Sequence, residues 1–298
     1  MKRRTFLKCI ALAICIAPSR SFSHVLHAGN STAGTRAGAG EDSQSGNLIN
    51  DQKLKDYLTK VRNPDSPHPA DIVLSNDQCR ILDSVVARLE RVCGFVGYGN
   101  FAIIDLEQTL KVAADIPAVG GFPVEETEFL EMVYSRDASD YGFFGEKQVV
   151  KINQKIDQQE IVKIEGNGNF LFRGEAEEKY QRIVSNLGNE AVLTSGIRGI
   201  IKQFYLFLKK ASRYGGNLSL ASRSLAPPGY SYHATGDFDI GQRGFGEANF
   251  SEQFTHTSVF KMLTEQGFVE YRYKRDNLLG VRYEPWHIKL KPGSHFSL

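Results

Sequence analysis

Hydrophobic residues recur at helical spacing through the first half of the chain. The pattern Ser75-x-x-Gln78 is typical of a capping box at a helix start. After it, apolar residues recur every three or four positions until Gly94, at Leu82, Val85, Val86, Leu89, Val92 and Cys93. Two more helices are predicted, one from about Asp105 and one after Pro123. Residues 51–150 are therefore predicted to form a helical N-terminal subdomain.

Beyond residue 150 the hydrophobic period shortens toward two, which favours strands. The segments 160–164 and 170–172 flank a Gly-Asn-Gly turn and predict a hairpin. Helices are predicted at 176–186, 199–213 and 257–266, and strands at 191–194, 268–273 and 281–283. Residues 151–298 are thus predicted to be an α+β domain in which helices flank a small antiparallel sheet.

The N-terminus has the pattern of an export signal. A basic segment, Met1 to Lys8, precedes an apolar run from Cys9 to Ala17 that is too short for a permanent membrane span. Its paired arginines resemble the twin-arginine export signal, and a plain secretory signal is the alternative. We expect a signal over residues 1–23, a Gly/Ser/Ala/Thr-rich flexible linker over 24–50, and a mature protein in the periplasm.

The charge balance narrows the class of partner. The 298 residues include 36 basic and 34 acidic side chains, which gives a formal net charge of +2, and no basic stripe is interleaved with aromatic residues. This composition argues against nucleic-acid binding. Hydrophobic residues make up 41% of the chain, enough for a sizeable core.

Two short segments carry ligand-type side chains. Residues 227–241 contain one histidine, two aspartates and three glycines, and residues 283–287 add Glu284 and His287. A catalytic zinc usually has three imidazole or carboxylate ligands and leaves its fourth position to water. His233, one aspartate and His287 would supply the ligands, and Glu284 would serve as general base.

These residues resemble the zinc D-alanyl-D-alanine carboxypeptidases of the VanY type, which share a fold with Hedgehog. The resemblance lies in Ser231-x-His233-x-x-Gly236 followed by a nearby aspartate, and in Glu284-x-Trp286-His287. A third motif is Ser195-Gly196-Ile197-Arg198 with Gln203 five residues later, in which Ile197 and Gly199 depart from the family pattern. The resemblance implies a DD-peptidase/Hedgehog-like fold for the C-terminal domain.

One departure concerns the metal ligands. The family places its aspartate seven residues after the histidine, where this chain has Ile240. The candidates are Asp239 and Asp237, and we favour Asp239 because a one-residue slip in a glycine-bearing loop is the smaller change. The predicted zinc ligands are therefore His233, Asp239 and His287.

Substrate roles follow from the same motifs. Arg198, placed between a strand and a helix start, is expected to hold a substrate carboxylate bidentately. Gln203 is a substrate-binding candidate by motif, with a packing or supporting role as the alternative. Ser231 is expected to contact the substrate, or else to stabilise its loop.

The resemblance implies a metallocarboxypeptidase that removes the terminal residue from peptidoglycan stem peptides, with D-Ala-D-Ala specificity. An L,D-carboxypeptidase, a peptidoglycan endopeptidase and a non-catalytic zinc-containing wall-binding protein are the alternatives. Glu284 favours catalysis, because a structural zinc site would not require it.

Overall fold

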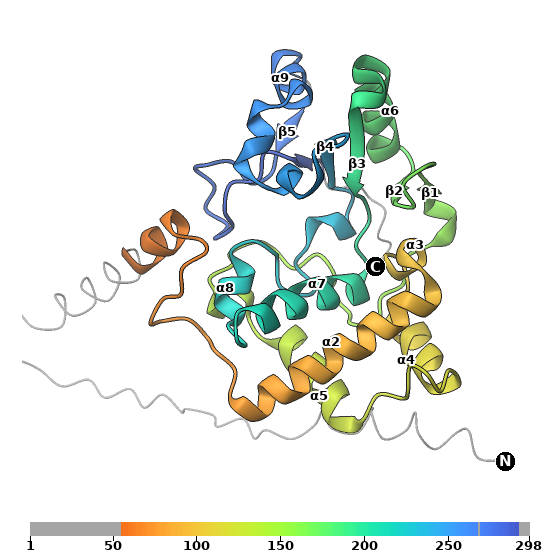
Figure 1. Ribbon diagram of the computed structural model, residues 1–298, viewed down its shortest axis with the longest axis vertical. Coiled ribbons are helices and arrows are strands. Elements are labelled where there is room, and N and C mark those ends of the chain that lie inside the picture. The colour runs from red at the N-terminus through yellow and green to blue at the C-terminus, as the bar shows by residue number, and fades with distance from the viewer. Residues whose placement is uncertain (1–54, 268, 292–298) are drawn as a thin grey trace, which may run out of the picture. The chain divides into compact units, whose positions relative to one another are not determined.

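The computed structural model describes residues 55–267 and 269–291 (Figure 1). All of them belong to a single unit of the chain, Asn47–Leu298. The predicted export signal and linker, residues 1–23 and 24–50, lie outside the described residues. Within the described ranges, no helix combines the length and the apolar character that a membrane crossing requires.

The three predicted helices of this region are α2 (Asn76–Val96), α4 (Leu106–Asp115) and α5 (Val124–Ser135), and a short helix that was not predicted, α3 (Tyr98–Phe101), follows α2. The capping boxes at Ser75 and Asp105 are both formed, which confirms these predicted helix starts. The predicted end of α2 at Gly94 is wrong. Gly94 continues the helix, and the chain turns at Gly97, whose φ of 82° suits glycine and whose N–H bonds back to the Cys93 carbonyl.

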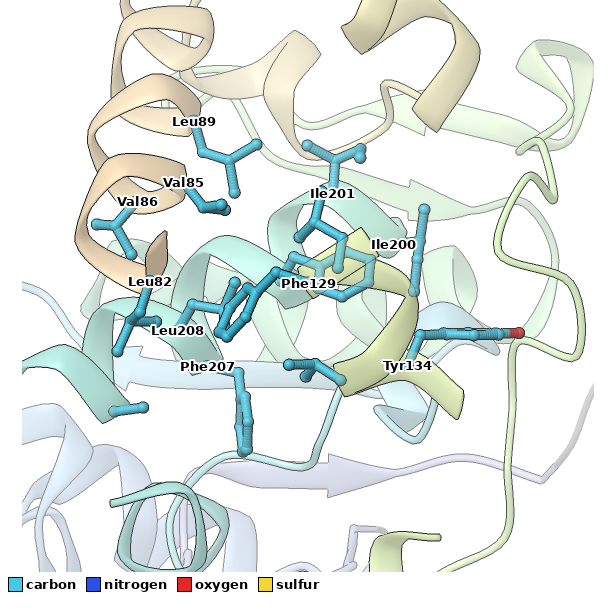
Figure 2. Packing of buried hydrophobic residues seen from close by; sticks show 14 of the residues in the cluster. Leu82, Val85, Val86, Leu89, Phe129, Tyr134, Ile200, Ile201, Phe207 and Leu208 are labelled. Atoms are coloured by element: carbon cyan, nitrogen blue, oxygen red, sulfur yellow. The ribbon is translucent and has the colours of Figure 1, made fainter. Parts of the chain in front are cut away.

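A later helix completes this hydrophobic core. Helices α7 (Ile200–Arg213) and α8 (Leu218–Ser222) come from beyond residue 150, yet α7 packs against α2. Figure 2 shows Leu82, Val85 and Leu89 of α2 facing Ile201, Phe207 and Leu208 of α7, with Phe129 of α5 beside them. The core of the helical region therefore spans the predicted boundary at residue 150, because α7 supplies one side of it.

The strands form two small antiparallel sheets. Strands β1 (Ile161–Lys163) and β2 (Phe170–Phe172) make the predicted hairpin. The second sheet has the order β3-β4-β6-β5, from β3 (Ala191–Ser195), β4 (Phe238–Gln242), β5 (Glu270–Tyr271) and β6 (His287–Lys289). Helices α6 (Glu175–Leu187) and α9 (Ser258–Glu265) pack against it (Figure 1). This arrangement confirms the predicted α+β class.

The register of the second sheet brings distant segments together. Asp239 of β4 lies opposite Ser195 on one side and His287 of β6 on the other. The predicted strand at 281–283 is wrong. There the backbone is irregular, and the chain turns at residues 285–286, where Pro285 offers no N–H to a ladder. Pairing begins only at His287, so β6 is short and Glu284 lies just outside the sheet.

Candidate metal centre

Three ligand-type side chains meet where β4 and β6 pair. His233 lies on a short 3-10 helix (Tyr232–Ala234), Asp239 on β4, and His287 at the start of β6. One nitrogen or oxygen from each lies within 4.8 Å of the others, and all three residues are buried. Asp239 Oδ1 is 3.3 Å from His233 Nε2 and 3.3 Å from His287 Nδ1. The two distant motifs therefore meet as predicted.

Hydrogen bonds on the far side of each ring fix the two imidazoles. His233 Nδ1 lies 2.8 Å from the carbonyl oxygen of Gly196, which can only accept, so Nδ1 carries the proton. His287 Nε2 lies 3.0 Å from Asp237 Oδ2 and carries the proton by the same logic. The lone pairs of His233 Nε2 and His287 Nδ1 therefore both face Asp239.

Two of the three converging atoms have no hydrogen-bond partner among the described residues. These atoms, His233 Nε2 and Asp239 Oδ1, are both buried. Buried polar atoms are rarely left without a hydrogen-bond partner, because removing them from water without a replacement bond costs free energy. Two imidazole lone pairs and a carboxylate oxygen are the donor set that a divalent metal such as zinc accepts. The residues therefore fit a metal ion.

The charges at the site agree with this use. Burial, with help from nearby Arg198, lowers the pKa of His233 to about 4, so its ring is neutral at pH 7. Burial opposes the charge of Asp239, yet His233 and Arg198 hold the pKa of its carboxyl well below the ordinary value. A neutral imidazole and an ionised carboxylate are the forms that bind metal.

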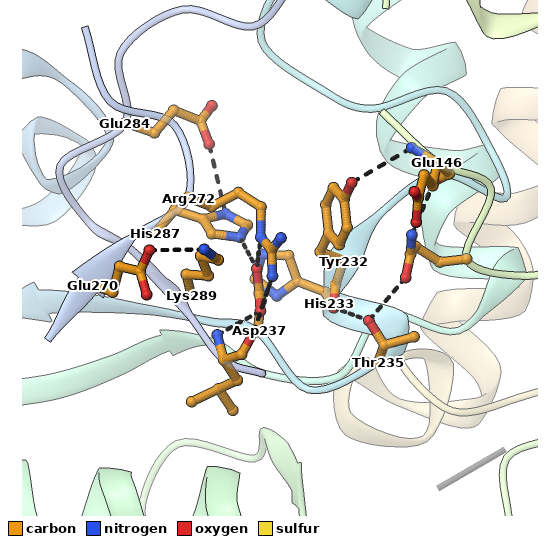
Figure 3. Close-up of polar contacts among 12 residues, drawn as sticks. Glu146, Tyr232, His233, Thr235, Asp237, Glu270, Arg272, Glu284, His287 and Lys289 are labelled. Carbon is orange, nitrogen blue, oxygen red and sulfur yellow. Dashed lines mark hydrogen bonds and ion pairs between the residues drawn. The ribbon is translucent and has the colours of Figure 1, made fainter. Parts of the chain in front are cut away.

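Asp237, the other aspartate candidate, lies behind His287. It accepts two bonds from Arg272, at 2.5 and 3.0 Å, and one from the Leu290 N–H at 2.8 Å, besides facing His287 Nε2 (Figure 3). Its oxygens are thus occupied on the side away from the metal centre. Asp237 orients His287, as carboxylates behind metal-binding histidines commonly do.

Glu284 lies beside the three ligand atoms. Its Oε2 is 3.7 Å from His287 Nδ1 (Figure 3), and the residue is buried. Burial raises the pKa of this carboxyl to about 7. A carboxyl with a pKa near neutrality can both take and return a proton at physiological pH, as a general base must.

A pocket of about 240 Å³ opens over this cluster, and Arg198, Ser231 and Glu284 line it. Arg198 donates to Ser195 Oγ at 2.9 Å and to Asp239 Oδ2 at 2.5 Å, so it already contacts a predicted metal ligand. Ser231 is buried in the pocket wall.

Gln203 does not line the pocket, in contrast to its predicted substrate role. Its amide nitrogen donates to the Arg198 carbonyl at 2.8 Å, and its amide oxygen accepts from the Gly229 N–H at 2.9 Å. The physical reason is its position on the buried side of α7. Gln203 therefore supports Arg198 and the loop that leads to Ser231.

Two features of the site escaped the sequence analysis. Arg272, which holds Asp237, lay in a predicted strand whose alternation marked no functional residue. Lys202 lies inside the Arg198-to-Gln203 motif and lines the pocket together with Tyr98 of α3. Lys202 could have been noticed as a lysine on the apolar side of a helix, because lysine is rarely buried without a charge partner.

Comparisons with known proteins agree with this geometry. Residues 172–292 match the family model "VanY: D-alanyl-D-alanine carboxypeptidase". That range contains His233, Asp239, Glu284 and His287, together with the Arg198 motif. A search of curated proteins gave no match.

Similar solved structures include two VanY-type proteins. One is the vancomycin resistance D,D-pentapeptidase VanY from a VanB-type resistance cassette, as a mutant in complex with Zn(II). It is 21% identical, with a TM-score of 0.38, over 49% of this chain and 85% of that one. The other is VanYB in complex with D-alanine-D-alanine, 20% identical with a TM-score of 0.37, over 49% and 83%. Likeness at this level carries no argument, and the family match says that residues 172–292 are similar to VanY-type D-alanyl-D-alanine carboxypeptidases.

Proposed function

We propose that this protein is a zinc-dependent D-alanyl-D-alanine carboxypeptidase that removes the C-terminal residue from peptidoglycan stem peptides. The observation that carries the proposal is the meeting of three ligand atoms, from His233, Asp239 and His287, beside Glu284 in the wall of a pocket. The atoms of His233 and Asp239 are buried and have no hydrogen-bond partner among the described residues. The family match supports the bond type. The export signal predicted from the sequence supports the periplasm as the place of action.

The residues divide the chemistry between them. Zinc, when bound, supplies a Lewis acid that polarises a carbonyl and lowers the pKa of water. Glu284 takes a proton from the attacking water and returns it to the amine that leaves, which its pKa of about 7 allows. Asp237 and Gly196 hold the two imidazoles in their ligand tautomers.

Arg198 adds positive charge beside the reacting centre. Among the described residues, two of its nitrogens donate side-chain hydrogen bonds, to Ser195 and Asp239, and a guanidinium has five N–H donors. The others can bind an oxygen of the substrate. A fixed cation at this point stabilises negative charge that develops during peptide hydrolysis. Ser231, on the same pocket wall, contributes a contact that orients the peptide.

The test is the variant Glu284→Ala in zinc-loaded protein. We expect turnover of a pentapeptide-bearing muropeptide to fall by roughly 10²- to 10⁴-fold, because the general base is lost, while the zinc content stays at one ion per chain. Glu270→Ala, which removes an exposed glutamate from the sheet edge, is the matched control and should leave turnover unchanged. Turnover by Glu284→Ala at the parent rate would reject the proposal.

The bond that is cut needs its own measurement. Pentapeptide, tetrapeptide and cross-linked muropeptides are incubated separately, and mass spectrometry identifies the released residue. D-alanine from the pentapeptide alone supports the D,D-carboxypeptidase. Release from the tetrapeptide or cleavage of the cross-link would instead assign an L,D-carboxypeptidase or an endopeptidase to the same site.

A further inference from the structure

Lys202 is a buried cation in the wall of the metal pocket. It lies in the first turn of α7, four residues after Arg198, and only 3% of its surface is exposed. Lysine almost never reaches this degree of burial without a charge partner. Its side chain lines the same pocket as His233, Asp239 and His287.

No described acidic group pairs with this lysine. Its Nζ donates to the Tyr98 hydroxyl at 3.4 Å and lies 4.5 Å from the centre of the Tyr98 ring, and it forms no ion pair within the part of the chain described. The ring offers cation–π attraction, but it is 56% exposed and neutral. Burial and the nearby Arg198 charge lower the lysine pKa to about 7. The pocket therefore holds a buried amine, partly charged at pH 7, with no described anion beside it.

The acidic groups of the pocket are already engaged. Asp239 bonds to Arg198 and faces the two histidines, and Glu284 lies beside His287. Lys210, two turns further along α7, lines the pocket about 12 Å away and feels the charges of Arg282 and Glu284. The pKa of Lys202 instead depends on the charges of Arg198 and Asp239. An anion that neutralises Lys202 must come from outside the described residues.

We propose that Lys202, covered by Tyr98, is a specificity-determining residue that binds a carboxylate of the substrate peptide. This inference rests on the proposed function, because peptides are the ligands considered. The carboxylate has two possible sources, the C-terminus of the peptide and the side chain of the residue before the D-alanyl-D-alanine unit. The α3 helix acquires a role in either case, since it supplies Tyr98.

The experiment measures peptide binding by calorimetry in zinc-loaded Glu284→Gln protein, which is expected not to consume its ligand. Three acetylated tripeptides ending in D-alanyl-D-alanine are compared. The first has lysine before that unit and a free C-terminus, the second is its C-terminal amide, and the third replaces the lysine with a diamino dicarboxylic acid. Each is titrated with Lys202 intact and as Lys202→Met.

With Lys202 intact, we expect the peptide that carries the recognised carboxylate to bind about 10- to 100-fold more tightly than the peptide that lacks it. The peptide that lacks it is the amide if Lys202 binds the C-terminus, and the lysine peptide if Lys202 binds the side chain. In Lys202→Met this difference should vanish, while the peptide without that carboxylate keeps its affinity. Loss of the gap between acid and amide assigns the C-terminus. Loss of the gap between the lysine and dicarboxylic peptides assigns the side chain.

Lys209→Met, on the same helix but outside the pocket lining, is the matched control and should preserve the gap. Equal weakening of all three peptides by Lys202→Met, an unchanged gap, or no gap with Lys202 intact would each overturn the inference. Thermal melting checks folding, and Lys202→Gln replaces the methionine variant if that variant does not fold. Because binding is the readout, a Lys202-dependent gap in a protein that hydrolyses no peptide would reject only the proposed function.

Discussion

Two buried polar clusters in this molecule differ in how completely they are satisfied. Between α2 and α5, Arg88 donates to both oxygens of Glu126, at 2.6 and 2.9 Å, and Ser84 donates to the same carboxylate at 2.6 Å. Within the described residues, the remaining hydrogen bonds of Arg88 run to the Val119 and Gly120 carbonyls. At the metal centre, by contrast, His233 Nε2 and Asp239 Oδ1 have no described partner.

The difference separates structure from function. A buried charge is tolerated when the fold supplies its partners, as it does for Glu126. At the metal centre, Gly196 and Asp237 bond to the far side of the two histidine rings and Arg272 holds Asp237. The ligand atoms of the two histidines and Asp239 are left facing one another. The helical cluster is therefore complete by itself, and the metal cluster is complete only with a ligand.

Removing a metal ligand should produce the largest effect. Structural zinc sites contribute about 10–16 kcal/mol in apparent free energy, so one ligand among three or four accounts for about 4 kcal/mol. Asp239→Ala should therefore lower zinc affinity by about a thousandfold. Competition with a chromogenic chelator measures this, and Asp276→Ala, an exposed aspartate, is the control. Full zinc affinity in Asp239→Ala would show that the ligand set is wrong.

Breaking the helical pair should affect stability and leave zinc binding unchanged. Glu126→Gln leaves Arg88 buried without a counter-charge, so we expect the free energy of unfolding to fall by about 3 kcal/mol, measured by urea denaturation. The double variant Arg88→Met with Glu126→Leu should recover most of that loss, because it removes both charges. A larger loss in the double variant would contradict this account.

The same pair predicts a pH dependence. Burial opposes the charge of Glu126, but the bonds from Arg88 and Ser84 outweigh it and hold the pKa below the ordinary 4.5. A carboxyl with a lowered pKa in the folded state contributes stability above the unfolded pKa. That contribution is lost as the pH falls below 4.5 and through the folded pKa. Glu126→Gln should remove this part of the acid-induced loss.

The elements that local pattern controls could be predicted from the sequence. The capping boxes at Ser75 and Asp105 and the β1–β2 hairpin lie where the chain's own periodicity placed them. The strand predicted at 281–283 was wrong because an alternating pattern also occurs in irregular segments, and strand pairing depends on a neighbour far away in sequence. The predicted end of α2 was wrong because Gly94 adopts helical geometry. The helix ends at Gly97, where the backbone has a positive φ, and the sequence pattern did not distinguish the two glycines.

The candidate site divides in the same way. The motifs identified His233, Asp239, Glu284 and His287 as candidates, because catalysis restricts the residue types that a metal centre can use. Other residues of the site came from segments without a motif: Arg272, the residue after β5, and Tyr98, from the helical region. Any arginine can hold an aspartate from many backbone positions, so no local pattern marks it. Gln203 had the right motif but faces Arg198 and Gly229, which only the packing of α7 reveals.

The smallest expected effect tests the hydrogen bond between Asp237 and His287. Asp237→Asn keeps the size of the side chain but weakens the bond from His287 Nε2 and the ion pair with Arg272. Changes behind a metal-binding histidine typically cost 10- to 100-fold in affinity, so we expect a loss of about 2 kcal/mol in zinc binding, half that of Asp239→Ala. The same chelator competition measures it. A loss as large as that of Asp239→Ala would place Asp237 among the ligands, whereas no loss would mean that β4 and β6 alone orient His287.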